Sequence, residues 1–328
     1  MNNSDAKDAF SFAGATKSKG HNEREADSDR MNAAPRIAIA EALRNNWFEI
    51  WYQPKIDLKR KRLAGAEALA RIRHPQLGVL PPGSFLPEVD ENSVAELAQH
   101  ALLATLCDWM LFEEAGFNLH LAVNLPVSVL SKLPIPRLIT EYRPKSARWP
   151  GLIVELTEDQ IARAGALAEE IASQLHVTGI TIAIADFGAG YSSFSSLRDL
   201  PFAELKIDHS FVKGCATDAT NAAICQTAID LTHRFGGVAV AEGVDSQADL
   251  QSLMAMGCDF GQGALIAPPM PKERFLELLH QRMNKPRALT PKEAMKAPQK
   301  SIGRVACSSG ETAPARRYAA DAPRTSAI

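Results

Sequence analysis

Acidic and amide side chains recur in this sequence where short apolar runs end. The clearest case is the apolar, β-branched run Thr181–Ala185, which is followed by Asp186 and by the two glycines of a Gly-x-Gly turn, Gly188 and Gly190. This composition is typical of a strand that is buried on both faces. Because α/β folds build their sites from side chains at the carboxyl ends of such strands, Asp186 is a candidate site residue.

The same placement recurs at other predicted strand ends. The polar side chains that share it are Glu67, Asn124, Glu155, Lys206, Asp208 and Glu242. Carboxylates from separate strands share a low-dielectric cleft only where cations neutralise them or where some bind protons. Oxygen ligands without histidine or cysteine suit Mg²⁺ or Mn²⁺, and the eight histidines lack the spacing of a zinc site. With a lysine nearby to neutralise phosphate charge, the pattern fits metal-dependent hydrolysis of a phosphoester.

A simpler interpretation applies to each residue alone. A single acid at a strand end is more often a helix cap or an ion-pair partner than a ligand, and for Lys206 or Asp208 alone that interpretation is preferred. The joint placement on successive strands is harder to explain by chance, so the sequence favours a metal-dependent site.

Strands and helices must alternate along the chain to position these residues. Strands are expected at 48–52, 63–70, 119–123, 152–156, 181–185, 204–207 and 238–241 and near residue 259, and helices at 94–112, after 156, in a short piece after 185, and at 222–235, 248–256 and 271–282. About eight such repeats predict a (β/α)₈ barrel of the TIM type over residues 36–285, the usual length of about 250 residues. A doubly wound open sheet is the alternative, but no G-x-G-x-x-G follows the first strand.

Composition narrows the class of protein. The 328 residues contain 38 acidic and 36 basic residues, so net charge does not favour a nucleic-acid polymer as partner. The five cysteines are scattered, and neither a signal peptide nor a membrane span is evident, which predicts a cytoplasmic protein. The polar segments 1–35 and 286–328 are predicted to be a disordered leader and a disordered tail.

The candidate residues also lie in motifs that resemble the EAL domains, the phosphodiesterases of cyclic di-GMP. The matching segments are Glu67-Ala-Leu-Ala-Arg71, Tyr52-Gln-Pro54, Val123-Asn124-Leu125, Val154-Glu-Leu-Thr-Glu158, Asp186-Phe-Gly-Ala-Gly-Tyr-Ser-Ser193, Leu205-Lys-Ile-Asp208, Ala241-Glu-Gly-Val244 and Gly261-Gln-Gly263. They cover residues 37–280 in the family's order, which makes the resemblance specific.

The resemblance implies a TIM-type barrel that hydrolyses cyclic di-GMP to linear pGpG with two Mg²⁺ or Mn²⁺ ions. It implies that Lys206 and Gln262 are catalytic, that Arg71 and Gln53 bind the substrate, and that Glu158 anchors a loop that couples dimerisation to activity. The metal ligands that it implies are Glu67, Asn124, Glu155, Asp186 and Glu242. It also implies a homodimer, and regulation is expected through dimerisation, the tails or a protein in trans.

One position departs from the family pattern. Active members carry two successive aspartates before Phe-Gly, and here the first is Ala185. The resemblance implies that the missing carboxylate bridges the two metals, which repel each other unless an anion lies between them. We therefore expect hydrolysis to be impaired. Smaller departures are Ala189 in place of threonine and Asp245 in place of glutamate.

Three functions stay open at this point: an impaired phosphodiesterase, an inactive receptor for cyclic di-GMP, and a protein-interaction module without nucleotide. The other matched ligands favour the enzyme, whereas Ala185 favours the receptor. We expect weak phosphodiesterase activity.

Overall fold

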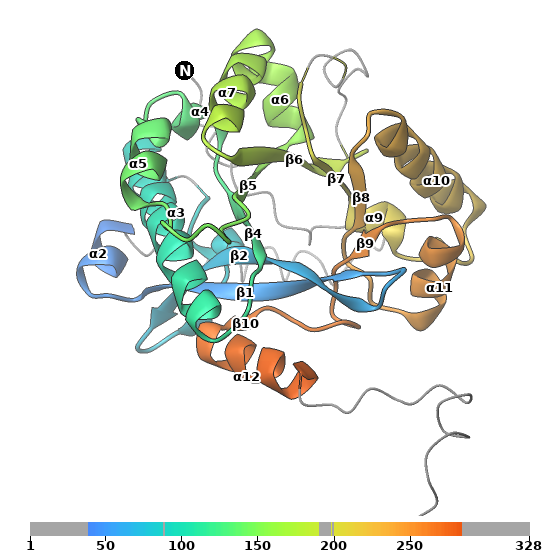
Figure 1. Cartoon of the computed structure of the whole chain (residues 1–328), viewed down its shortest axis with the longest axis horizontal. Coiled ribbons are helices and arrows are strands. Elements are labelled where there is room, and N and C mark those ends of the chain that lie inside the picture. The colour runs from blue at the N-terminus through green and yellow to red at the C-terminus, as the bar shows by residue number, and fades with distance from the viewer. Residues whose placement is uncertain (1–38, 88, 190–197, 199, 284–328) are drawn as a thin grey trace, which may run out of the picture. The chain divides into compact units, whose positions relative to one another are not determined.

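Eight strands close into a ring in the computed structural model, which describes residues 39–87, 89–189, 198 and 200–283. The order around the ring is β1-β2-β4-β5-β6-β7-β8-β9, and β9 pairs with β1 to close it. Figure 1 looks down this ring and shows the helices α3, α7, α10 and α11 outside it. The predicted TIM-type barrel is therefore confirmed. The predicted leader 1–35 and tail 286–328 lie outside the described residues, so the domain boundaries stay a prediction.

The strands that carry the candidate residues run parallel to each other. Neighbouring pairs from β2 to β9 are parallel, so their carboxyl ends meet at one mouth. Their bounds are β2 Arg62–His74, β4 His120–Asn124, β5 Leu152–Thr157, β6 Ile180–Phe187, β7 Glu204–Ile207, β8 Val238–Ala241 and β9 Phe260–Gly261. All six residues of β5 are buried, as expected for a strand covered on both faces.

The first strand, β1 (Phe48–Asp57), runs antiparallel to both of its neighbours in the ring. The expected strand–helix repeat implies parallel strands throughout, so it does not predict this direction. The reason is the short connection 58–61, because parallel strands need a crossover of about a dozen residues and antiparallel strands do not. Two short strands, β3 (Gly78–Leu80) and β10 (Met270–Pro271), pair with β2 and β1 outside the ring.

Helices cover the outside of the ring. The longest, α3 (Glu91–Glu114), begins at Asp90, whose side chain accepts from two backbone N–H groups, and it buries residues such as Trp109 and Phe112. The others are α2 Ile39–Arg44, α4 Val127–Leu130, α5 Ile135–Tyr142, α6 Glu158–Ala164, α7 Ala166–Val177, α9 His209–Val212, α10 Ala219–Arg234, α11 Gln247–Ala255 and α12 Lys272–Met283, with the 3₁₀ turn Pro82–Ser84.

The single helix expected after residue 156 is two helices, α6 and α7. Gly165 separates them with a φ of 51° and a ψ of −126°, a conformation that breaks the helical hydrogen-bond pattern and that favours glycine. The short helix expected after β6 falls on residues 190–197 and 199, which lie outside the described ranges.

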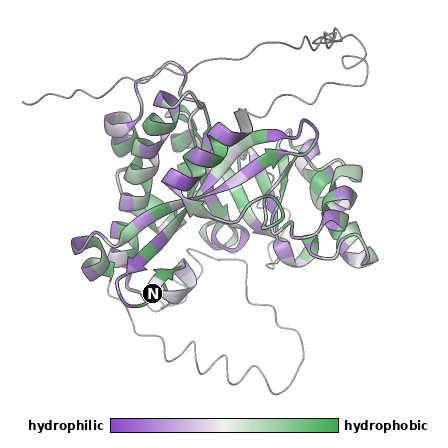
Figure 2. Ribbon diagram, turned by 90° about the horizontal axis from the view of Figure 1, so that it is seen from below, coloured by the Kyte–Doolittle hydropathy of each residue, from purple (hydrophilic) through white to green (hydrophobic). Residues whose placement is uncertain are grey.

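Apolar side chains fill the space between the strands and the helices. Figure 2 shows hydrophobic segments along the strands and polar segments on the outer surfaces of the helices. Buried residues from strands and helices form one large cluster, with a small group inside the barrel, Ala122, Ile153 and Ala183. No helix in residues 39–283, as far as they are described, is long and apolar enough to span a membrane.

Candidate active site

Lys206, on β7, lies at the centre of a cluster of carboxylates at the carboxyl ends of the strands. Its Nζ is 3.0 Å from Oε2 of Glu67 on β2 and 2.6 Å from Oε2 of Glu155 on β5. It is also 2.6 Å from Oε1 of Glu242, which directly follows β8. The Lys206 side chain is 1% exposed, so these three carboxylates replace the water that would otherwise solvate the ammonium. The ring thus brings together four residues that are up to 175 positions apart (242 − 67).

Amide side chains complete the coordination of Glu67. Asn124, the last residue of β4, donates from Nδ2 to Oε1 of Glu67 at 2.9 Å. Gln262, directly after β9, donates from Nε2 to Oε2 of Glu67 and to Oε1 of Gln53 on β1. Gln53 in turn donates to the carbonyl oxygen of Ala267. Within the described part of the chain, Oε1 of Gln262 is buried and accepts no hydrogen bond.

The charges in this cluster shift one another's pKa values in opposite directions. Burial raises the pKa of Glu155 well above its usual value, and the nearby Glu67 carboxylate raises it further. Burial also raises the pKa of Glu242. Burial alone would raise the pKa of Glu67, but the ammonium of Lys206 and the amides of Gln262 and Asn124 hold it below its usual value. Burial opposes the charge on Lys206, yet the three carboxylates together raise its pKa well above the usual value. Lys206 is therefore a permanent cation.

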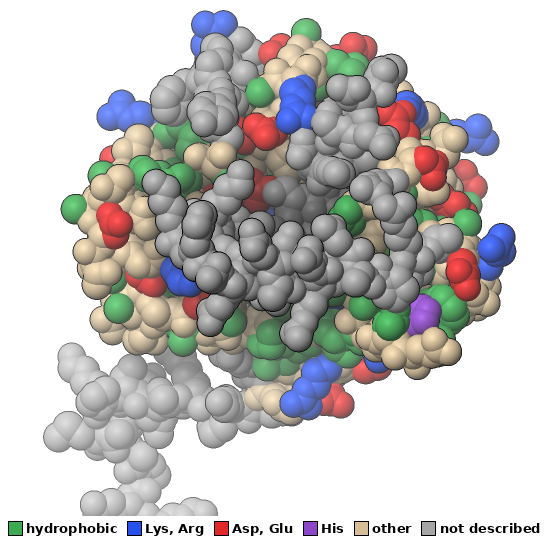
Figure 3. All heavy atoms as spheres, turned by 180° about the vertical axis from the view of Figure 1, so that it is seen from behind, with side chains coloured by type: hydrophobic (Ala, Val, Ile, Leu, Met, Phe, Trp, Pro, Cys, Tyr) green, Lys and Arg blue, Asp and Glu red, His purple; other side chains and the backbone are tan. Residues whose placement is uncertain are grey.

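A cleft of about 640 Å³ opens above this cluster, a size typical of small-ligand sites. Figure 3 shows a hollow near the middle of the molecular face, with acidic side chains visible inside it. Arg71 lines the cleft, and its guanidinium lies 5.7 Å from the ring centroid of Trp51. It donates to the carbonyl oxygen of Ala70, and it forms no ion pair with a described residue. Burial lowers the pKa of the Arg71 guanidinium. Because the usual pKa of arginine is very high, the side chain still carries its positive charge.

Ala185 and Asp186 form part of the cleft wall where β6 ends. Asp186 has a φ of 54°, unusual for a non-glycine residue, and the pairing of β6 with β7 is irregular between Ile184 and Phe187. This irregular backbone turns consecutive side chains toward the cleft, so both residues line it. At Ala185 the cleft wall is a methyl group, which cannot ligate a metal.

Glu158 holds the loop that follows Asp186. Its Oε2 accepts a hydrogen bond of 2.8 Å from the backbone N–H of Gly188, and its side chain is buried at the start of α6. The carboxylate therefore ties the loop after β6 to the end of β5. Gly188 cannot be replaced easily, because an added Cβ would lie 2.9 Å from the Phe211 ring and its φ is 95°.

Asp208 has the structural role that its sequence context favoured. Its Oδ1 accepts from the backbone N–H of Ser210 at 2.8 Å and caps α9. The next residue, His209, was not predicted, although it lines the cleft and its Nδ1 is 3.3 Å from Oδ2 of Asp208. Its signal in the sequence is its position, directly after a strand end that already carries two polar side chains.

The donor types around the cleft fit a hard divalent cation. The cleft is lined by the carboxylates of Glu67, Glu155, Asp186 and Glu242 and by the amide of Asn124, as well as by the cations Lys206 and Arg71. Oxygen donors of this kind suit Mg²⁺ or Mn²⁺. Among the described residues, however, no three His, Cys, Asp or Glu side chains are arranged to hold a metal ion. The carboxylates surround the ammonium of Lys206 instead.

Comparison with known proteins agrees with this geometry. Residues 36–269 match the model of the EAL domain. The cyclic di-GMP phosphodiesterase RocR of Pseudomonas aeruginosa is 36% identical over 250 residues, which cover 74% of this chain and 63% of RocR. The solved PaMucR phosphodiesterase in complex with c-di-GMP is 32% identical, with a TM-score of 0.64, covering 72% of this chain and 97% of that one.

A second solved structure, the EAL enzyme Bd1971 with bound cAMP and cyclic di-GMP, has a TM-score of 0.67 and 26% identity. The alignment covers 79% of this chain and 70% of the Bd1971 chain. The chain spans less than two thirds of the length of the first curated relatives that it matches, 63% of RocR and 40% of the P. aeruginosa phosphodiesterase PA2567. With its motifs in order around one mouth of a closed barrel, the chain belongs to the EAL domain family.

Proposed function

We propose that this protein is a metal-dependent phosphodiesterase that hydrolyses cyclic di-GMP to linear pGpG, at a rate limited by Ala185. The observation that carries the proposal is the cluster of Lys206 with Glu67, Glu155 and Glu242 at the bottom of a cleft of about 640 Å³. Relatives whose names state this activity support the choice of substrate.

Arg71 is suited to bind a phosphate of the substrate. Its planar guanidinium presents several donors, of which only one is used by a described acceptor, the carbonyl oxygen of Ala70. The Trp51 ring behind it fixes its orientation. The oxygens of a phosphate in the cleft would accept hydrogen bonds from the Arg71 guanidinium and so replace the water that burial has removed.

Lys206 and Gln262 are suited to act on the attacking water and on the phosphate charge. The buried ammonium of Lys206 places a permanent positive charge where negative charge grows in the transition state. The free Oε1 of Gln262 can accept a hydrogen bond from the attacking water and so orient a lone pair of that water toward phosphorus. Gln53 and Glu67 fix the amide of Gln262 from the other side.

Glu67, Asn124, Glu155, Asp186 and Glu242 are the residues that would hold Mg²⁺ or Mn²⁺. Bound divalent ions would supply a water of lowered pKa and additional positive charge beside the phosphate. Because three of the carboxylates contact Lys206, its side chain must share them with an incoming cation. Ala185 offers no oxygen at the position where the family pattern has a carboxylate, so we expect weak metal occupancy and slow hydrolysis.

An inactive receptor for cyclic di-GMP is the second candidate function. The methyl group of Ala185 in the cleft wall is the observation that favours it, because a receptor needs Arg71 and the cleft but not a bridging carboxylate. A homodimer, a regulatory protein in trans and a cytoplasmic location stay predictions, and a loop anchored by Glu158 would serve the coupling of a dimer to the site.

The test is a product assay with purified protein, cyclic di-GMP and either Mg²⁺ or Mn²⁺. We expect pGpG from the wild type and none from Lys206→Met, which controls for a contaminating phosphodiesterase. Binding is measured in parallel by calorimetry with Ca²⁺ in place of the activating metal. Binding of the nucleotide without pGpG would favour the receptor, and the absence of binding would leave only the protein-interaction module.

A further inference from the structure

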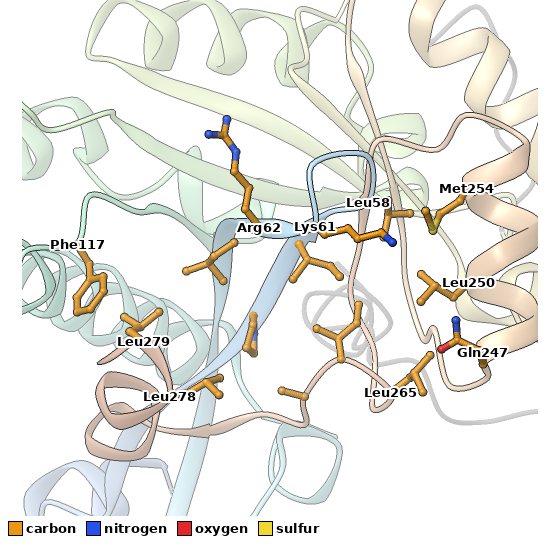
Figure 4. Close-up of a pocket in the computed structure, with 15 residues that line it drawn as sticks. Leu58, Lys61, Arg62, Phe117, Gln247, Leu250, Met254, Leu265, Leu278 and Leu279 are labelled. Atoms are coloured by element: carbon orange, nitrogen blue, oxygen red, sulfur yellow. The ribbon is translucent and has the colours of Figure 1, made fainter. Parts of the chain in front are cut away.

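A second cavity, of about 620 Å³, lies outside the barrel between the β1–β2 turn and the helices α11 and α12. Its walls are mainly aliphatic and include Leu58, Leu250, Leu278 and Leu279. Figure 4 shows these side chains around the open space, with the strands on one side and α11 on the other. We call this cavity the apolar groove. It shares no lining residue with the catalytic cleft.

The rim of the apolar groove exposes large hydrophobic side chains to solvent. Leu265 is 40% exposed and Met254 is 38% exposed, and both line the groove. An exposed apolar patch that continues into a cavity is typical of a site that binds an apolar ligand or surface.

Four consecutive cations lie beside the groove, Lys59, Arg60 and Lys61 in the turn and Arg62 at the start of β2. Arg60 is paired with Asp57 at 2.9 Å. The other three are exposed and form no ion pair with any residue in the described ranges. In Figure 4 the Lys61 side chain points toward Leu58 and Met254, whereas the guanidinium of Arg62 points away from the apolar side chains. The turn thus presents unneutralised positive charge at the edge of an apolar cavity.

The turn is held firmly in this place. The backbone N–H of Leu58 donates to the carbonyl oxygen of Asp259 at 2.9 Å, and the Leu58 side chain is 1% exposed. A Cβ added at Gly261 would lie 3.0 Å from Leu58, which shows how closely the turn packs on β9. Lys61 has a φ of 52°, which reverses the chain direction within the turn. The backbone that carries the cations is therefore fixed relative to the groove.

We propose that this face docks on anionic phospholipid bilayers, with an acyl chain in the apolar groove and the lipid phosphates at Lys59, Lys61 and Arg62. The combination of a cationic edge and an apolar cavity matches an anionic amphiphile. A purely apolar ligand would leave the cations without a partner, and a simple anion would leave the apolar cavity unfilled. Net charge over the whole chain hides this local cluster, because acids elsewhere balance it.

The cationic turn lies at the amino-terminal end of β2, away from the catalytic cleft, whereas the groove rim at Leu265 belongs to the loop after β9, in which Gly263 and Ala264 line the cleft. The turn precedes β2, and Glu67 follows on β2 toward the carboxyl ends of the parallel strands. The proposal is independent of catalysis and would hold equally for a receptor.

Sedimentation of the full chain with vesicles tests the proposal. We expect it to pellet with vesicles of phosphatidylcholine mixed with phosphatidylglycerol and to stay in solution with phosphatidylcholine alone. The double variant Lys59→Glu/Lys61→Glu should bind at least about tenfold more weakly, because it reverses two charges at the membrane surface. Leu265→Asp, which places a charge at the groove rim, should weaken binding to a similar extent.

Matched controls are Lys145→Glu and Leu167→Asp, which change an exposed lysine and a 43% exposed leucine elsewhere on the barrel. Both controls should bind like the wild type. Equal binding to both kinds of vesicle, no binding, or unchanged binding by Leu265→Asp would overturn the proposal. A dimer that Leu265→Asp dissociates, without change in vesicle binding, would instead assign the groove to a second copy of the chain.

Discussion

The ammonium of Lys206 pairs with three carboxylates, those of Glu67, Glu155 and Glu242. One ammonium faces three carboxylates in a site from which water is excluded, and the pKa values of Glu155 and Glu242 are raised in consequence of burial. The cluster therefore holds together only while the ammonium is present, and removal of one partner from a buried ion pair is costly.

Lys206→Met should lower the free energy of unfolding by about 3–5 kcal/mol, because it leaves buried carboxylates without a counter-charge. Urea unfolding followed by circular dichroism, with a chelator present, measures this loss. Lys213→Met is the matched control, since Lys213 is exposed at the end of the neighbouring helix α9 and should change stability by less than about 0.5 kcal/mol. Equal stabilities of the two variants would contradict the role given to Lys206.

The described cysteines should differ strongly in reactivity. Cys107 is exposed, whereas Cys225 is buried and burial raises the pKa of its thiol to about 12. Since only the thiolate reacts, iodoacetamide at pH 8 should modify Cys107 much faster than Cys225 or Cys258. Mass spectrometry of peptides from native protein measures the rates, and denatured protein is the control in which the three should react alike. Rapid modification of Cys225 in the native protein would mean that α10 opens readily.

At the scale of elements, the loop after β9 places Gln262 by a very close backbone contact. A Cβ added at Gly263 would lie 2.2 Å from the backbone nitrogen of Val244. The backbone N–H of Val244 also donates to the carbonyl oxygen of Gln262 at 3.0 Å, so the two loops are fixed to each other.

Gly263→Ala should therefore destabilise the protein by more than about 2 kcal/mol and displace Gln262 from Glu67. Thermal unfolding measures the first effect, and the rate of pGpG formation measures the second. Gly83→Ala serves as the comparison, because an added Cβ meets nothing within 4 Å there. If both alanine variants unfold at the same temperature, the contact with Val244 does not constrain the loop.

The start of α11 should give the stability of the protein a pH dependence. Ser246 and Asp249 form reciprocal hydrogen bonds there, and Asp249 also accepts from the backbone N–H of Ala216 at 3.0 Å. Burial alone would raise the pKa of Asp249, but the hydrogen bonds from Ser246 and Ala216 hold it below its usual value. Its ionised form thus stabilises the fold above the unfolded pKa of about 3.9, and this is lost as the pH falls through the lowered folded pKa.

Asp249→Asn should cost about 1 kcal/mol at pH 7, and the difference from the wild type should vanish in acid. Urea unfolding at a series of pH values measures it. Asp230→Asn, at an exposed position on α10, should differ little from the wild type at any pH. A difference for Asp249→Asn that persists in acid would show that charge is not the cause.

The sequence predicts most of these elements because their signals are local. Apolar runs such as Leu152–Leu156 need both faces buried, and the polar residue that ends or follows each run must then lie at the mouth. The direction of β1 could also have been inferred, since the connection 58–61 is too short for a parallel crossover. The break at Gly165 has no comparable signal, because glycine occurs within helices as well as between them.

At the scale of the whole molecule, what the sequence could not predict is which side chains meet when the ring closes. Glu67 was predicted as a metal ligand and Lys206 as a catalytic residue, and their contact at 3.0 Å depends on strands that are 139 residues apart. The link from Gln262 to Gln53 likewise exists only because β9 pairs with β1. The apolar groove arises from segments far apart in the sequence, none of which indicates a cavity by itself.

The most direct test is the initial rate of pGpG formation by the wild type and by Ala185→Asp, each at saturating cyclic di-GMP with Mn²⁺. A restored carboxylate should strengthen metal occupancy, so we expect measurable turnover by the wild type and at least about tenfold faster turnover by the variant. Equal rates would contradict the role given to Ala185. If neither protein forms pGpG although both are folded and bind the nucleotide, this barrel is not a phosphodiesterase.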